Sequence, residues 1–211
     1  MIIANSVFTI ALFITYLALW YIKRKELFKT EGAEANVLPR STQPTQKYFA
    51  KLERILTGSI VLIIPAHLFF RNQFALTAYL EPLDIMSIKI TGFLIGIAGL
   101  AICRIAQVTI GKSWRVGIDN QAKTGLITHG IYRLIRNPTY TGLFILCAGI
   151  WLLNPTYLYG SWLLLFILTI EFQVRCEEEY LTVLYGNQYL EYLKRTKRYF
   201  PFYKLQIRTT I

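Results

Sequence analysis

Long apolar runs alternate with polar segments along the whole chain. The five runs cover about 5–22, 55–70, 85–110, 142–153 and 158–174. An α-helix needs about 20 mostly apolar residues to cross a bilayer, and its backbone groups are satisfied within the helix itself. The pattern therefore predicts an all-α membrane protein with about five transmembrane helices, of which the fourth, from a 12-residue run, is short for a full crossing.

The charged residues predict how these helices are oriented. The formal net charge is +11, which in a soluble chain would suggest a nucleic-acid partner. Here all but Arg71 and Lys89 of the 23 basic residues fall on one side of the predicted helices or at its membrane edge. Cytoplasmic loops carry such an excess of lysine and arginine. We therefore expect no nucleic-acid partner, an outside amino terminus and a cytoplasmic carboxyl terminus.

Two details of the first half refine this topology. The first apolar run lacks the flanks of a cleavable signal peptide, so we interpret it as a retained helix that ends at a cytoplasmic loop, residues 23–29. The sequence does not decide whether the linker 30–54 contains an additional half-buried helix. In the third run, Gly92 and Gly96 have the four-residue spacing of a close helix-packing seam.

Nothing in the cysteine and histidine pattern predicts a metal site. Cys103, Cys147 and Cys176 are scattered, and two of them lie within apolar runs. Metal sites and disulfide frameworks show characteristic short spacings that are missing here. We expect these cysteines to be packing residues.

Two polar pieces flank the final helical hairpin and form the candidate site. They cover 126–142 and 171–202, and because a hairpin returns to its own side of the membrane, the two pieces meet in space. Pro138 forces a change of direction at Asn137, which frees backbone amides for a ligand. Arg133 and Arg136 would share a face if helical and could bind a carboxylate or phosphate, or they could simply anchor the chain to headgroups. The sequence predicts a cytoplasmic pocket here.

Acidic residues enter the second piece against its basic trend. Glu177, Glu178 and Glu179 are consecutive and point in different directions around a helix, so at most two face one pocket, and Glu179 is expected to point outward. Glu171 near the end of an apolar helix is either paired with Arg175 or functional. The helix that follows, 180–193, has an aromatic face suited to lie on the membrane surface or to cover the pocket.

These motifs resemble the integral-membrane methyltransferases related to isoprenylcysteine carboxyl methyltransferase, a family that includes phospholipid methyltransferases. The similar segments are "LITHGIYR" at 126–133, "RNPTYTG" at 136–142, "EE" at 177–178 and "YGNQYLEY" at 185–192. The resemblance covers about 111–202 and divides the chain into amino-terminal helices, 1–110, and a catalytic region, 111–211. Asn137 stands where the eukaryotic enzymes have histidine.

The resemblance implies an S-adenosylmethionine-dependent enzyme that lacks the glycine-rich loop of soluble methyltransferases. It assigns Arg136 and Glu178 as catalytic residues. The adenosine part would be lined by Leu126, Thr128, His129, Gly130 and Tyr132. The methionine end and the methyl group would be surrounded by Arg136, Asn137, Pro138 and Tyr140. Glu178, together with Glu177, would hold the cofactor's ammonium or the substrate head group.

The resemblance also implies a lipid-like or small amphipathic acceptor, bearing a carboxylate, amine or thiol, that enters from the membrane. Two alternatives stay open. One is an NADPH-dependent membrane reductase of the steroid 5-alpha-reductase type, whose Pro-Asn-Tyr-x-Gly-Glu motif compares with 138–143 but without the asparagine and glutamate. The other is a non-catalytic membrane protein whose tail binds anionic lipid or a partner. The sequence does not determine the acceptor atom or the oligomeric state.

Overall fold

The protein is an all-helical bundle, as the hydropathy pattern predicts. The computed structural model describes residues 2–32, 34–38, 41, 43–71, 73–118 and 125–201. The main helices are α1 (Ile2–Glu31), α2 (Pro44–Phe69), α3 (Met86–Ile110), α4 (Pro138–Leu153), α5 (Tyr157–Tyr185) and α6 (Asn187–Arg195). Short 3-10 helices in the connections are η2 (Ala75–Thr77), η3 (Glu81–Leu83), η4 (Gly111–Ser113) and η5 (Gly130–Arg133).

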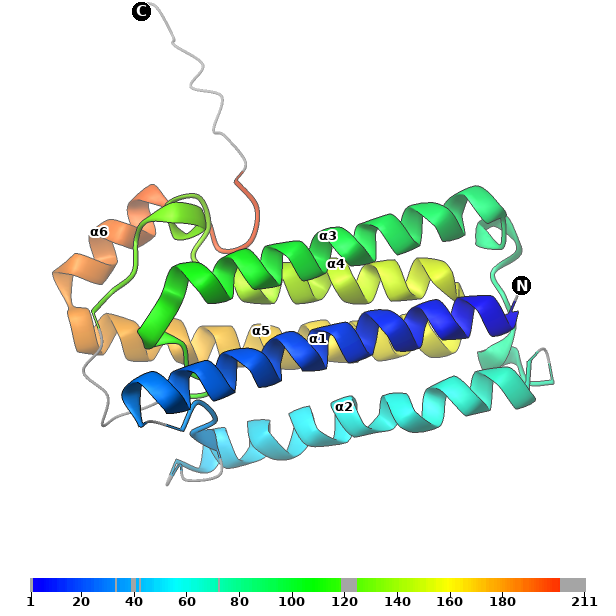
Figure 1. The fold of residues 1–211 in the computed structure, drawn as a ribbon, viewed down its shortest axis with the longest axis horizontal. Helices are drawn as coiled ribbons and strands as arrows, with labels where there is room; N and C mark the ends of the chain where they lie inside the picture. Colours follow the sequence, from blue (N-terminus) through cyan, green and yellow to red (C-terminus); the bar gives the residue numbers. More distant parts are fainter. Residues whose placement is uncertain are drawn as a thin grey trace, which may run out of the picture.

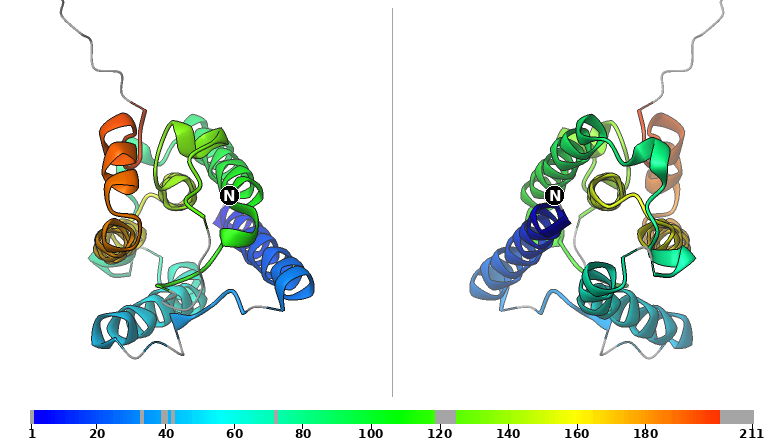
Figure 2. Two further views of the ribbon diagram at one scale, coloured as in Figure 1. Left: turned by 90° about the vertical axis from the view of Figure 1, so that its left-hand side faces the viewer. Right: turned by 90° about the vertical axis from the view of Figure 1, so that its right-hand side faces the viewer.

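The first five helices lie side by side along the long axis of the molecule, and successive helices run in opposite directions (Figure 1). Four of them, α1, α2, α3 and α5, are long and apolar enough to cross a membrane, whereas α4 is shorter. The helix α6 and the segment before α4 lie at the end where α1, α3 and α5 finish, opposite the amino terminus (Figures 1 and 2). This end of the bundle, called the basic end below, carries the candidate site.

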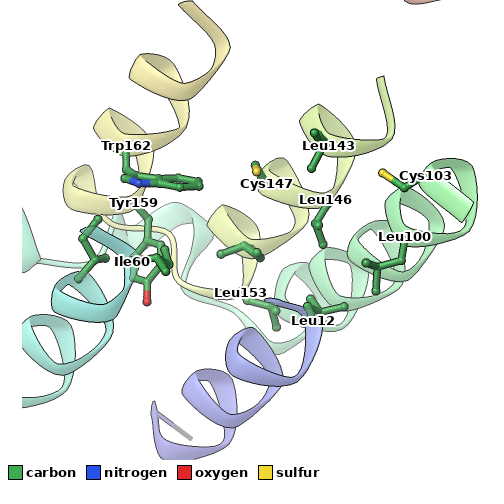
Figure 3. Packing of buried hydrophobic residues seen from close by; sticks show 12 residues of the cluster. Leu12, Ile60, Leu100, Cys103, Leu143, Leu146, Cys147, Leu153, Tyr159 and Trp162 are labelled. Carbon is green, nitrogen blue, oxygen red and sulfur yellow. The ribbon is translucent and has the colours of Figure 1, made fainter. Parts of the chain in front are cut away.

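The short helix α4 is the most enclosed of the five. Its 16 residues rise about 24 Å, less than the roughly 30 Å of a hydrocarbon core. Leu146, Cys147, Ile150 and Leu153 are buried, and they pack in one core cluster with side chains of α1, α2, α3 and α5 (Figure 3). A helix sheltered by its neighbours in this way does not have to match the bilayer thickness by itself.

Glycines bring the backbones of α3 and α4 into direct contact, which confirms the predicted packing seam. A Cβ atom added to Gly99 would lie 2.6 Å from the carbonyl oxygen of Gly142, and one added to Gly149 would lie 2.5 Å from that of Gly92. Such approaches are possible only without side chains. Gly96 takes part from both sides, because its backbone faces Gly149 and a Cβ there would meet Leu12 of α1.

Three helix boundaries differ from the sequence prediction. Residues 23–29, expected to form a loop, are helical, and α1 continues to Glu31. Charged side chains keep this part out of the lipid, but they do not interrupt the hydrogen bonds of the helix backbone. The helix ends at Gly32, whose φ of +61° favours glycine. A large part of the linker 30–54 belongs to α2, which begins at Pro44. The single helix expected over 180–193 is divided by Gly186, with φ of +53°, into the ends of α5 and α6.

Candidate active site

The turn before α4 is held by the segment that follows α6. The backbone amide of Arg136 donates to the carbonyl of Lys197 at 2.8 Å, and that of Asn137 donates to the carbonyl of Arg198 at 3.1 Å. The expectation that the proline turn leaves these amides free for a ligand was therefore wrong, since the returning chain uses them. The same contacts bring the carboxyl-terminal segment against the amino terminus of α4 and set the position of the side chains described next.

Arg136, Asn137 and Glu178 form the centre of the site. Arg136 Nε donates to Glu178 Oε1 at 3.1 Å, and Asn137 Nδ2 donates to the same oxygen at 3.0 Å. A second guanidinium nitrogen of Arg136 donates to the carbonyl oxygen of Thr196. Only 12% of the Arg136 side chain and 10% of the Glu178 side chain are exposed. The predicted meeting of the two polar pieces thus occurs, and it places opposite charges side by side in a sheltered position.

Arg198 extends this centre to Glu171. Its Nη2 lies 2.7 Å from Glu178 Oε2, and its Nη1 lies 2.8 Å from Glu171 Oε1. The hydrogen bonds to Glu178 raise the pKa of Arg198 above its ordinary value, so this guanidinium stays charged. Glu171 is paired with Arg175, as one of the two interpretations predicted, and it also accepts from Tyr199.

This centre combines carboxylates with guanidinium groups. Two carboxylates, of Glu171 and Glu178, face the three guanidinium groups of Arg136, Arg175 and Arg198. Glu177, next to Glu178, adds a third carboxylate close by, so the site offers charged groups of both signs.

A second polar cluster lies deeper along α5. Glu177 Oε1 accepts from the hydroxyl of Tyr140 at 2.8 Å and from Gln173 Nε2 at 2.9 Å. Gln173 is paired with Gln46 of α2 through hydrogen bonds of 3.2 and 3.3 Å, and both side chains are fully buried. Gln46 also accepts from the backbone amide of Ile118. This chain of hydrogen bonds ties α2 and the segment after α3 to the glutamate pair.

The predicted adenosine residues divide into two groups. Thr128, His129 and Gly130 are exposed, and Leu126 is partly buried, all in the segment that leads into η5. Tyr132 is buried instead, and its carbonyl accepts from the hydroxyl of Tyr192 at 2.6 Å. Burial raises the pKa of Tyr192 to about 12, so this hydroxyl keeps its proton at physiological pH.

The remaining predicted residues are placed as follows. Pro138 is buried in the first turn of α4, where a missing amide hydrogen costs nothing. Glu179 is exposed, in agreement with its expected outward direction. Arg133 is also exposed, whereas Arg136 points into the cluster, so the two arginines do not act from a common face.

Sequence reasoning missed Arg198, Thr196, Gln173 and Gln46. Arg198 lies in a basic tail whose charges were interpreted only as topology. Gln173 did carry a signal, because it interrupts the apolar pattern that leads to Glu177. Gln46 lies 127 positions from Gln173, and no local pattern connects them.

Together these features define a multi-pass helical membrane protein with a charged, partly buried site at one end of the bundle. A family model described as phospholipid methyltransferase matches residues 87–188, from α3 to the start of α6. The chain is 33% identical over 121 residues to a probable protein-S-isoprenylcysteine O-methyltransferase of Oryza sativa subsp. indica. It is 30% identical over 127 residues to the protein-S-isoprenylcysteine O-methyltransferase of Homo sapiens. The resemblance predicted from the motifs is confirmed.

The matches cover only part of each relative. The aligned region is 54% of this chain and 62% of the rice protein, and 56% of this chain and 42% of the human protein. A solved structure gives wider coverage. The eukaryotic intramembrane Ras methyltransferase ICMT (isoprenylcysteine carboxyl methyltransferase) superposes with a TM-score of 0.59 at 22% identity, over 92% of this chain and 68% of that one. The fold is thus similar to that of this solved structure over nearly the whole bundle, including α1 and α2.

Proposed function

We propose that this protein is an integral-membrane methyltransferase that uses S-adenosylmethionine and modifies a lipid-like acceptor. The observation that carries the proposal is the sheltered ion pair between Arg136 and Glu178, held at the turn before α4. The relatives named as isoprenylcysteine O-methyltransferases support the reaction class.

The residues of this site fit the amino-acid end of the cofactor. That end carries a carboxylate and an ammonium on one carbon, and Arg136 and Glu178 offer the two complementary charges next to each other. When the cofactor is absent the two side chains neutralise each other, so neither is buried unpaired. Asn137 shares the oxygen of Glu178 and holds it in place.

We assign the other predicted residues to the rest of the cofactor. Leu126, Thr128, His129 and Gly130 would contact the adenosine, for which the exposure of the last three is suitable. Tyr132 and Pro138 would act through backbone position, because both are buried. Tyr140 would border the methyl group, and Glu177 would assist Glu178 in holding the ammonium or the substrate head group.

The cofactor, when bound, supplies a methyl group on a positively charged sulfur. Its leaving group would be a neutral thioether, and Arg136 and Glu178 would hold the amino-acid end of the cofactor during the transfer. The protein has mainly to align the acceptor atom, the carbon and the sulfur. For a carboxylate acceptor Arg136 can hold one oxygen, whereas for an amine Glu178 can accept the released proton.

The acceptor and the topology complete the proposal. We infer that the acceptor is an amphipathic molecule with a carboxylate, amine or thiol, and that it enters from the bilayer between helices. By the positive-inside rule the basic end, with the site and the carboxyl terminus, faces the cytoplasm and the amino terminus lies outside.

Calorimetric titration of the detergent-purified protein with S-adenosylhomocysteine tests the cofactor assignment. We expect saturable binding that Arg136→Ala removes and Glu179→Gln retains, because Glu179 is exposed and points away from the cluster. NADPH serves as the competing ligand. Binding of NADPH alone, or of neither ligand, would contradict the proposal. Binding of S-adenosylhomocysteine that survives Arg136→Ala would place the pocket elsewhere in the protein.

A further inference from the structure

An apolar groove runs between α1 and α3 on the outer side of the bundle. Its volume is about 400 Å³. The walls are formed mainly by Leu12, Leu19, Phe93, Ile97 and Leu100. Its polar members are Thr15, whose hydroxyl donates to the carbonyl of Ala11 within α1, and Arg104. Among the described residues that line the groove, Arg104 therefore provides the single charge.

The guanidinium of Arg104 lacks a partner within the described part of the chain. Its Nη1 is buried and makes no hydrogen bond with the described residues. A charged group in an apolar, membrane-embedded helix is costly and is normally paired. The other intrahelical cation of α3, Lys89, follows this rule, because it is paired with Asp84. The exception at Arg104 points to a partner outside the described part of the chain.

The depth of Arg104 indicates what that partner is. Arg104 lies six residues before the end of α3 at Ile110, or about 9 Å along the helix axis. Trp20 of α1 and Trp114 after α3 pack edge to face at this end, with ring centroids 6.3 Å apart. Tryptophans gather where hydrocarbon meets headgroups, and a long arginine side chain reaches up to that level. The guanidinium is thus within reach of headgroup phosphates.

The surroundings of the groove face lipid. Ile14 on α1 is 58% exposed, and Ile97 and Ile105 on α3 are 44% and 51% exposed. The cluster of Arg136 and Glu178 is formed instead by the start of α4, the end of α5 and the segment after α6. The groove is therefore a site of its own.

We propose that the groove between α1 and α3 binds one anionic phospholipid of the surrounding leaflet. Its phosphate would pair with Arg104, and one acyl chain would lie along Leu12, Phe93 and Ile97. A planar guanidinium matches phosphate oxygens, and basic pockets between membrane helices bind such headgroups. This inference goes beyond the proposed function and does not rest on it.

Native mass spectrometry of the full chain, titrated with phosphatidylglycerol or phosphatidylcholine, tests the site. We expect one phosphatidylglycerol to bind more tightly than phosphatidylcholine, and Arg104→Leu to weaken it roughly fivefold or more. Arg104→Lys retains the charge and should keep the preference in large part. Arg54→Leu is the matched control, because Arg54 is exposed on α2 and lies outside the groove.

Three results would overturn the proposal. The first is equal binding of the two lipids by the native protein. The second is phosphatidylglycerol binding that Arg104→Leu leaves unchanged. The third is displacement of the lipid by farnesylcysteine together with a raised KM for that acceptor in Arg104→Leu, which would make the groove an acceptor site. The first two results are read directly as lipid binding, so they are independent of whether the protein methylates anything.

Discussion

Arg136 and Glu178 lie 42 positions apart in the chain, and Arg136 Nε donates to Glu178 Oε1 at 3.1 Å. One comes from the turn before α4 and the other from the end of α5, so the helical hairpin between them sets their distance. Each has a further charged or polar partner, Thr196 for the arginine and Arg198 for the glutamate. The pair is therefore both a structural contact and, in our proposal, the means of binding a zwitterion.

Arg136→Ala and Glu178→Gln should each abolish turnover, with a loss of at least about 100-fold, because a charge-assisted hydrogen bond contributes about 1.5–3 kcal/mol and each residue makes more than one. Glu179→Gln should change turnover by less than about threefold, because its side chain is exposed. Methyl transfer from labelled S-adenosylmethionine measures all three. An equal loss in all three would mean that the pocket is misplaced.

Arg198→Ala should reduce activity much more than Arg175→Ala. Arg198 joins Glu171 to Glu178 and is 29% exposed, whereas Arg175 pairs with Glu171 and is 63% exposed. Exposed ion pairs contribute about 0–1 kcal/mol, so the Arg175 variant should lose less than about fivefold. The check is kcat and KM for the cofactor in both variants. Similar values for the two would show that Arg198 does not support Glu178.

Tyr140→Phe should lower stability by about 1–3 kcal/mol, because it leaves Glu177 without the hydroxyl that donates to it at 2.8 Å. Thermal unfolding in detergent gives the comparison. Tyr21→Phe is a suitable control, because that ring is 58% exposed on α1. If the two variants unfold at the same temperature, the contact of Tyr140 with Glu177 contributes no stability.

Gly99→Leu should prevent folding, whereas Gly58→Ala should be neutral or slightly stabilising. At Gly99 a Cβ would lie 2.5 Å from the backbone nitrogen of Leu146, which cannot move as a side chain can. At Gly58 nothing lies within 4 Å, and alanine favours the helix by about 0.5–1 kcal/mol. Yield and elution profile after detergent extraction report the outcome. A monodisperse Gly99→Leu protein would contradict the close packing of α3 and α4.

The sequence predicted the helices and the meeting of the two polar pieces because both follow from local rules. The length of an apolar run indicates a helix. A helical hairpin returns its two ends to the same side of the membrane, and this rule predicted that the pieces with Asn137 and Glu178 lie close together. No such local rule predicted that Arg198 belongs to the cluster. It reaches the cluster only because the chain after α6 folds back on 135–137, and those backbone contacts have no signature in the residues themselves.

Helix ends show the same limit on a smaller scale. Hydropathy locates where a helix leaves the lipid, but the backbone stops only at Gly32 or Gly186, where φ is positive. The charges of 23–29 therefore did not indicate the helix end, which lies at Glu31. In the deep cluster, Gln46 and Gln173 are individually visible as polar residues in or beside apolar runs, yet their pairing depends on how α2 packs on α5.

The glycine seam between α3 and α4 has a mechanical consequence. The backbones of α3 and α4 are in contact at Gly92, Gly99, Gly142 and Gly149. Because no side chains separate the two helices, we expect them to move together as one rigid unit. A lipid-like molecule that enters from the bilayer would therefore not pass between α3 and α4. We expect the opening instead beside α2, where a Cβ added to Gly58 would meet nothing within 4 Å.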